Sequence, residues 1–98
     1  MKVTFSPRAL AALSEIHAYN AEDSPRAAGE VVAFIENLCL KLGDYPRIGR
    51  PTDLKDVRVV PVVRYPYLVF YIILGASDEI RILRIRHGAR KPLDPNDI

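Results

Sequence analysis

The spacing of hydrophobic residues changes along the chain, and each spacing predicts a different kind of element. In residues 2–5 apolar and polar side chains alternate, which is typical of a short strand. Residues 7–20 place apolar side chains three and four positions apart, which predicts a helix with one buried stripe. Ser6 and Pro7 are its expected N-cap and first helical residue. The stripe consists of Ala9, Leu10, Ala12, Leu13 and Ile16.

The same signals predict a second helix over residues 25–42. Ser24 is the expected N-cap, Pro25 the first helical residue and Gly43 the stop signal. Its buried stripe consists of Ala28, Val31, Val32, Ile35, Leu38, Cys39 and Leu42. Because the link between the helices is short, we expect an antiparallel helical hairpin.

Three further strands follow a loop that contains two prolines and a glycine. We expect these strands at residues 57–63, 67–74 and 79–87, with a tight turn joining the last two. Helices and strands are thus segregated in the order β-α-α-β-β-β, which predicts an α+β fold with a small, mostly antiparallel sheet. The helical hairpin is expected to cover one face of the sheet and leave the other free. Residues 1–91 are expected to form a single domain, and residues 92–98 a flexible C-terminal tail.

The composition of the chain is that of a single globular domain. The chain has 98 residues, 49% of them hydrophobic and 27% charged, which is ordinary for one globular domain and argues against disorder. A single cysteine, Cys39, excludes an internal disulfide, so we expect a cytoplasmic setting. Neither a signal peptide nor a membrane span is predicted. Two histidines and one cysteine far apart predict no metal site, no cofactor and no nucleophilic catalytic arrangement.

Positive charge is concentrated in the second half of the chain. Residues 58–91 hold seven lysines and arginines against only Asp78 and Glu79, whereas the whole chain has a net charge of +2. Arg81, Arg84 and Arg86 alternate with isoleucine and leucine in the most strand-like segment of the sequence. These arginines either keep a solvated strand soluble or face an acidic partner.

Strict alternation along this last strand predicts two mixed faces. Ile80, Ile82, Arg84 and Arg86 are expected on one face, and Arg81, Leu83, Ile85 and His87 on the other. Each face would then be apolar at one end and cationic at the other. We expect the middle of the strand to be buried and the arginines to emerge beyond the cover of the helices.

The segment 57–63 is predicted to be an exposed edge strand. Pro61 lacks an N–H group and is disfavoured in a central strand. An unpaired apolar edge promotes aggregation unless a partner adds a strand or covers it with a helix. The residues expected to meet such a partner are Val59, Val60, Val62 and Val63.

The string YPYLVFYIILGASDEIRILRIRHGARKP, together with the order of elements, resembles the ParE/RelE superfamily of bacterial type II toxins, and most closely its ParE branch. The positions that match are Tyr71, Ile80, Ile82, Leu83, Arg84, Ile85, His87 and Arg90. The upstream stretch YPRIGRP resembles the loop P-x-x-G-R of the same branch, with Pro46, Gly49 and Arg50 in place.

This resemblance implies a toxin that a cognate, ParD-like antitoxin neutralises, with the four valines of segment 57–63 as the expected antitoxin contacts. ParE-type toxins inhibit DNA gyrase by binding, whereas RelE-type toxins cut mRNA in the ribosomal A site. RNA cleavage requires groups that take and give protons. Gly88 follows His87 where the RelE branch can carry a tyrosine, and no tyrosine occurs after Tyr71. The sequence therefore favours gyrase inhibition without enzymatic activity.

The residues expected to face the target are Arg84, Arg86, His87 and Arg90, with Arg50, Arg58 and Arg64 in support. Stable binding of nucleic acid by this chain alone is not expected, because the surplus of positive charge is modest. Two alternatives stay open, a RelE-like ribosome-dependent endonuclease and an inert or regulatory scaffold. A structural role for His87, as a strand-end residue bonded to a loop, also stays open.

Overall fold

A computed structural model describes residues 1–90 and 92–98 and confirms the α+β class and the predicted order of the main elements. The elements are β1 (Lys2–Phe5), α1 (Pro7–Ala21), α2 (Pro25–Lys41), β2 (Arg50–Pro51), β3 (Val57–Val62), β4 (Tyr67–Leu74), η1 (Gly75–Ser77), β5 (Glu79–His87) and η2 (Pro95–Asp97). Within the described residues, neither helix is long and apolar enough to cross a membrane.

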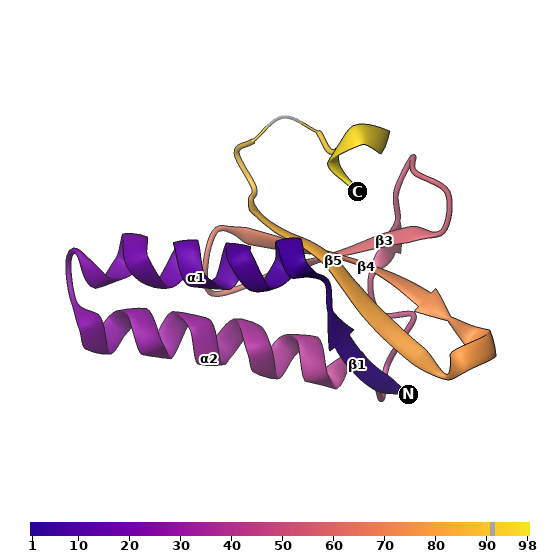
Figure 1. The fold of residues 1–98 in the computed structure, drawn as a ribbon, viewed down its shortest axis with the longest axis horizontal. Helices are drawn as coiled ribbons and strands as arrows, with labels where there is room; N and C mark the ends of the chain where they lie inside the picture. Colours follow the sequence, from indigo (N-terminus) through magenta and orange to yellow (C-terminus); the bar gives the residue numbers. More distant parts are fainter. Residues whose placement is uncertain (91) are drawn as a thin grey trace.

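The strands form one mixed sheet in the order β1-β5-β4-β3-β2. β3, β4 and β5 pair antiparallel as predicted, whereas β1 pairs parallel with β5. The antiparallel hairpin of α1 and α2 lies along one side of the sheet, and the C-terminal segment turns back toward the strands (Figure 1). The two-residue strand β2, within the predicted loop, extends the sheet beyond β3.

Both helices begin as their caps predict, and one face of each is buried. The Oγ atoms of Ser6 and Ser24 accept hydrogen bonds from backbone N–H groups three residues later. The buried residues of the two helices pack against β3, β4 and β5, and we call this cluster between the helices and the sheet the main core. Its helical members include Ala9, Leu13, Ile16, Val31, Ile35 and Cys39. The prediction was wrong for Leu10, which is 53% exposed because it points away from the stripe.

Gly43 follows the second helix as predicted, but for a different reason. No glycine among the described residues has a positive φ, so a left-handed cap is not what requires it. A Cβ atom at Gly43 would instead collide with the carbonyl oxygen of Met1. The N-terminal nitrogen of Met1 donates a hydrogen bond to the Gly43 carbonyl at 3.0 Å, so this glycine lets β1 approach the end of α2.

A bulge in β5 overturns the predicted division of that strand into two faces. The register passes from Phe70 opposite Arg84 to Tyr71 opposite Ile82, which leaves Leu83 without a partner residue. One extra residue reverses the alternation that follows it. Ile80, Ile82 and Ile85 therefore all join the main core on the helix side. Because of this reversal Arg84 no longer shares a face with Ile82, and Arg86 follows Arg84 toward the other side.

The predicted exposure of the valine-rich edge is also wrong. Val59, Val60 and Val62 are at most 7% exposed, and only Val63, in the following turn, is 92% exposed. β2 pairs with β3, and Thr52 N donates to Val57 O at 3.0 Å. Along a strand, every second residue directs its N–H and C=O groups to the same edge. Pro61 is therefore the next residue after Val59 whose backbone faces the edge of β3 beyond β2. A residue without an N–H group offers little for an added strand.

The C-terminal segment, residues 92–98, returns to the sheet, and its flexibility stays a prediction. It forms the short helix η2, and Leu93 packs against a second apolar cluster on the side of the sheet away from the helices. We call this second group the open-face cluster; it consists of Val57, Val59 and Phe70, with Leu54, Leu68, Ile72, Leu83 and Leu93 around them. The boundary predicted at residue 91 lies outside the described residues.

Glu79 joins the first and last strands and gives the fold a predicted pH dependence. A hydrogen bond from Thr4 Oγ1, with Arg81 and Lys2 nearby, lowers the pKa of the Glu79 carboxyl. A lowered folded-state pKa adds stability that is present above the ordinary glutamate pKa and lost as pH falls through the lowered value. We expect Glu79→Gln to destabilise the protein at neutral pH, with a difference from the wild type that shrinks in acid.

Melting curves of both proteins from pH 7 down to pH 3 measure this difference. Glu30→Gln is the charge-matched control, since Glu30 lies on the exposed side of α2 in an ion pair with Arg26. A difference that stays constant with pH would contradict the assignment.

Candidate functional site

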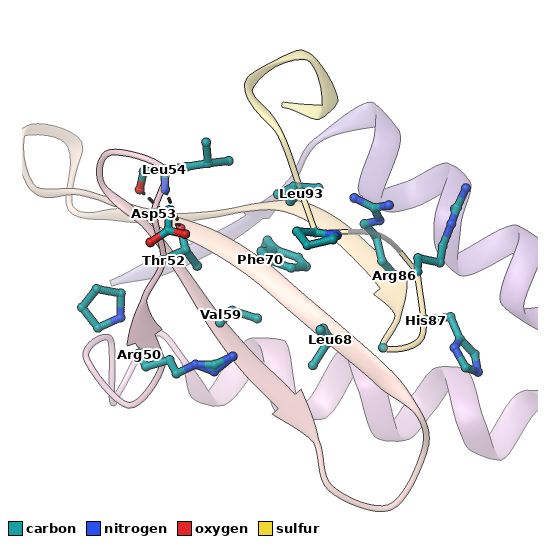
Figure 2. Close-up of a pocket in the computed structure, with 14 residues that line it drawn as sticks. Arg50, Thr52, Asp53, Leu54, Val59, Leu68, Phe70, Arg86, His87 and Leu93 are labelled. Carbon is teal, nitrogen blue, oxygen red and sulfur yellow. Dashed lines mark hydrogen bonds between the residues drawn. The ribbon is translucent and has the colours of Figure 1, made fainter.

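A hollow of about 420 Å³ lies on the open side of the sheet, between β2, β4, the end of β5 and the C-terminal segment. Its floor is apolar and its rim is basic, and we call it the basic hollow. Val59, Leu68 and Phe70 form the floor (Figure 2). Four of the seven residues predicted to face the target line it, namely Arg50, Arg86, His87 and Arg90.

Arg86 is the most enclosed cation of the basic hollow. Its side chain is only 9% exposed, and its Nη1 atom lies 3.4 Å from Oδ2 of Asp97 in the C-terminal segment. Within residues 1–90 and 92–98, the buried Nε atom of the same guanidinium has no hydrogen-bond partner. A buried, unpaired donor is costly, so Arg86 retains capacity for another acceptor.

Arg84 lies next to this pair and contacts the same segment. Its Nη1 atom donates a hydrogen bond of 2.6 Å to the backbone carbonyl of Asp97. Burial, followed by the neighbouring charges of Arg86 and Arg8, lowers the pKa of Arg84. Arginine nonetheless stays protonated in proteins, so these guanidinium groups form a crowded positive cluster.

His87 and Arg90 extend the cluster beyond the strand. The Nδ1 atom of His87 accepts a hydrogen bond of 3.0 Å from the backbone N–H of Ala89, and the ring meets that of Tyr67 edge-on at 5.9 Å. The His87 carbonyl also accepts from Arg90 N at 3.2 Å. His87 therefore fixes the turn that carries Arg90, which is the structural role that the sequence left open.

Two of the supporting arginines lie away from the basic hollow. Arg58 Nη1 donates a hydrogen bond of 2.6 Å to the Gly49 carbonyl, so this guanidinium stabilises the loop before β2. Arg64 lies over the ring of Tyr65, at 5.6 Å from its centroid, in the exposed turn between β3 and β4. Neither residue lines the hollow.

The loop P-x-x-G-R has a structural function, which is to hold Arg50 at the hollow. The hydroxyl of Tyr71 donates to Pro46 O at 2.7 Å and accepts from Gly49 N at 2.9 Å. A Cβ atom at Gly49 would lie within 2.6 Å of this hydroxyl, so only glycine fits. Burial raises the pKa of the Tyr71 hydroxyl, which therefore stays neutral and keeps its donated hydrogen bond.

The basic hollow presents groups that are suited to binding. Arginine side chains hold carboxylates or phosphates, and the apolar floor accepts aliphatic or aromatic groups. Tyr67, the tyrosine in contact with His87, is buried in the main core, and its hydroxyl faces Asn20 of α1 rather than the hollow. Among the described residues, no group of three histidines, cysteines, aspartates or glutamates is placed to hold a metal ion.

Sequence reasoning missed three residues of this site, Arg8, Leu93 and Asp97. Arg8 lies in the first turn of α1, where its charge adds to the larger effects that lower the pKa values of Arg84 and Asp97. Leu93 and Asp97 belong to the segment predicted to be a flexible tail, so the sequence gives them no role at the site. The available signal was the combination of one leucine with two aspartates in PLDPND, because it complements the mixed apolar and basic character of β5.

A family model described as the ParE toxin of the type II toxin–antitoxin system parDE matches residues 3–92. The chain belongs to this toxin family. The match spans both helices, the five strands and the turn that carries Arg90, so it includes nearly all of the basic hollow.

Two named relatives are also described as toxins. The chain is 37% identical to the putative toxin Y4kP of Sinorhizobium fredii over 87 residues, which cover 89% of this chain and 88% of the relative. It is 35% identical to toxin RelE2 of Caulobacter vibrioides, with 91% and 97% covered. Among solved structures, a chain of the chromosomal ParDE system from P. aeruginosa matches with a TM-score of 0.79 and 27% identity, covering 89% of this chain and 95% of that one.

Proposed function

We propose that this toxin inhibits DNA gyrase by binding, with the basic hollow as the surface that meets the target. The observation that carries the proposal is that Arg84, Arg86 and Arg90 lie together beside an apolar floor. We call these three residues the arginine cluster. Arginine and buried apolar groups are the residue types that dominate binding energy in protein interfaces. Arg50 contributes from β2, and His87 positions Arg90.

The described residues of the hollow favour binding over RNA cleavage. Cleavage through a 2′-hydroxyl needs one group to accept a proton and another to donate one. His87 lines the hollow, but its Nδ1 atom is engaged by Ala89, and the Tyr67 hydroxyl is directed to the helix side. Asp97, the carboxylate held among the arginines, has its pKa lowered by the Asp94 N–H and by Arg86, Arg84 and Arg8, which makes it a poor base.

A cognate antitoxin in the cytoplasm is the second partner that we propose. The related P. aeruginosa chain was solved as part of a ParDE toxin–antitoxin system. Of the four valines predicted to contact the antitoxin, only Val63 remains exposed, at 92%. Val59, Val60 and Val62 are buried, so Val63, in the turn after β3, is the one of these four valines that an antitoxin can reach without a change in the fold.

Purified toxin is expected to inhibit supercoiling by gyrase, or to trap cleaved DNA, and to leave ribosome-bound mRNA intact. Adding purified cognate antitoxin should restore supercoiling. Supercoiling gels and primer extension on mRNA in a translating extract measure the two activities in parallel. Codon-positioned cuts with unaffected supercoiling would assign the protein to RNA cleavage instead, and inactivity in both assays would identify an inert scaffold.

A further inference from the structure

The C-terminal segment occupies the region where the proposed target would bind. Asp97 meets Arg84 through its backbone carbonyl at 2.6 Å and Arg86 through Oδ2 at 3.4 Å. Leu93 lies above Phe70 at the apolar floor of the basic hollow (Figure 2). One short stretch of the chain thus supplies an aliphatic group to the floor and a carboxylate to the rim.

The segment presents its carboxylate in a fixed orientation. The Asp94 side chain accepts a hydrogen bond of 2.8 Å from Asn96 N, and Asp94 N donates one of 3.1 Å to Oδ2 of Asp97. This reciprocal capping orders the single turn η2. One turn with few buried contacts nonetheless opens at low cost compared with the core, so the segment is displaceable.

The arginine cluster is only partly neutralised by this segment. The hydrogen bond from Asp94 N, followed by the charges of Arg86, Arg84 and Arg8, lowers the pKa of Asp97. Arg86 Nε nonetheless stays buried with no partner among the residues that the structure describes. The single carboxylate of Asp97 does not accept a hydrogen bond from Arg86 Nε, and its Oδ2 atom already accepts one from Asp94 N. A ligand that brings a better-placed oxyanion would therefore bind more favourably than Asp97 does.

The chemistry of the segment indicates what kind of ligand replaces it. Phosphates of nucleic acid would satisfy the arginines but would leave the floor of Val59, Leu68 and Phe70 without an apolar partner. A protein segment with an acidic residue near an aliphatic one satisfies both parts of the site. The side chains of Leu93 and Asp97 already show this combination within the chain.

We propose that residues 92–98 act as an internal substitute for an acidic, aliphatic segment of the target protein, and that the target displaces them on binding. The free toxin therefore covers its own binding surface. This inference rests on the proposed function, because it assumes that the basic hollow faces the target. The apparent affinity for the target is reduced by the fraction of toxin in which the segment is in place.

The test uses the full chain carrying Leu93→Ser and Asp97→Asn, which removes the apolar contact of Leu93 and the carboxylate of Asp97 but keeps the hydrogen bond from Arg84 to the Asp97 backbone carbonyl. The probe is a fluorescent synthetic peptide with the segment's own sequence, PLDPNDI. If the segment is in place in about nine-tenths of the wild-type molecules, the double variant binds the peptide about tenfold more tightly than the wild type. A peptide with asparagine in place of its second aspartate should bind the double variant more weakly.

Asp78→Asn is the charge-matched control, because Asp78 lies in the distant β4–β5 turn with a positive φ that asparagine tolerates. It should bind the peptide as weakly as the wild type. If the double variant does not fold, the single variant Asp97→Asn tests the same point through the NMR signal of Arg86 Nε–H, which should shift and respond to added peptide.

Equal peptide affinity for the wild type and the double variant would overturn the proposal. Tighter binding of a short DNA duplex than of the peptide would overturn it in favour of a phosphate ligand. In a gyrase assay the double variant should inhibit at a lower concentration than the wild type. If neither inhibits gyrase while the peptide results hold, the proposed gyrase target fails and the internal cover stands.

Discussion

Replacing Ile35 by alanine is expected to lower the free energy of unfolding by about 2–5 kcal/mol. Ile35 lies in the middle of α2, is fully buried and belongs to the main core between the helices and the sheet. Removing three carbon atoms leaves a cavity that a small core cannot close. For a domain of this size the loss corresponds to a Tm lower by about 10 °C or more.

Leu40→Ala on the same helix is the matched control, because it removes the same number of carbon atoms from a side chain that is 56% exposed. Its effect should stay within about 0.5 kcal/mol, as is usual for surface sites. Thermal or urea unfolding of both variants measures the contrast. Similar losses for the two variants would show that the buried face of α2 is wrongly placed.

The elements that depend on local signals were predictable from sequence. Ser6 and Ser24 cap the helices where the sequence indicates, and apolar spacing identifies most of the buried face of α2. Pairing between distant segments has no such local signal. The parallel contact of β1 with β5 joins Lys2 to Glu79, and nothing near either residue specifies it.

The candidate site was predicted in its residue types but not in its arrangement. Four of the seven predicted residues line one hollow, because they lie on β2 or on β5 and the turn that follows it. The bulge at Leu83 places the following arginines on the opposite face of the sheet. A prediction that assigns residues alternately to the two faces of a strand contains no signal for one unpaired residue. The burial of Val59 depends on Leu54, Leu68 and other distant residues, which hydrophobicity alone does not reveal.

Alanine at Arg84, Arg86 or Arg90 is expected to abolish growth inhibition while the protein remains folded. An arginine at the centre of an interface can contribute about 2 kcal/mol or more, and its planar, permanently charged group is only partly replaced by lysine. These three residues lie outside the main core, so a melting curve should change far less than for Ile35→Ala. Toxicity on induction, measured beside expression level and Tm, separates lost binding from lost folding.

Arg26→Ala is the control for this series, because Arg26 has a 91% exposed side chain on α2 and its ion pair with Glu30 is also exposed. It removes the same charge and should leave the protein toxic. Arg86→Lys distinguishes charge from geometry, since lysine keeps the positive charge but cannot reproduce the two-pronged contact of a guanidinium. If the arginines served only solubility, every variant would stay toxic at normal expression, and the target surface would lie elsewhere on the fold. A graded series, with alanine inactive and lysine partly active, would instead support the basic hollow as the place where the toxin meets an acidic group of its target.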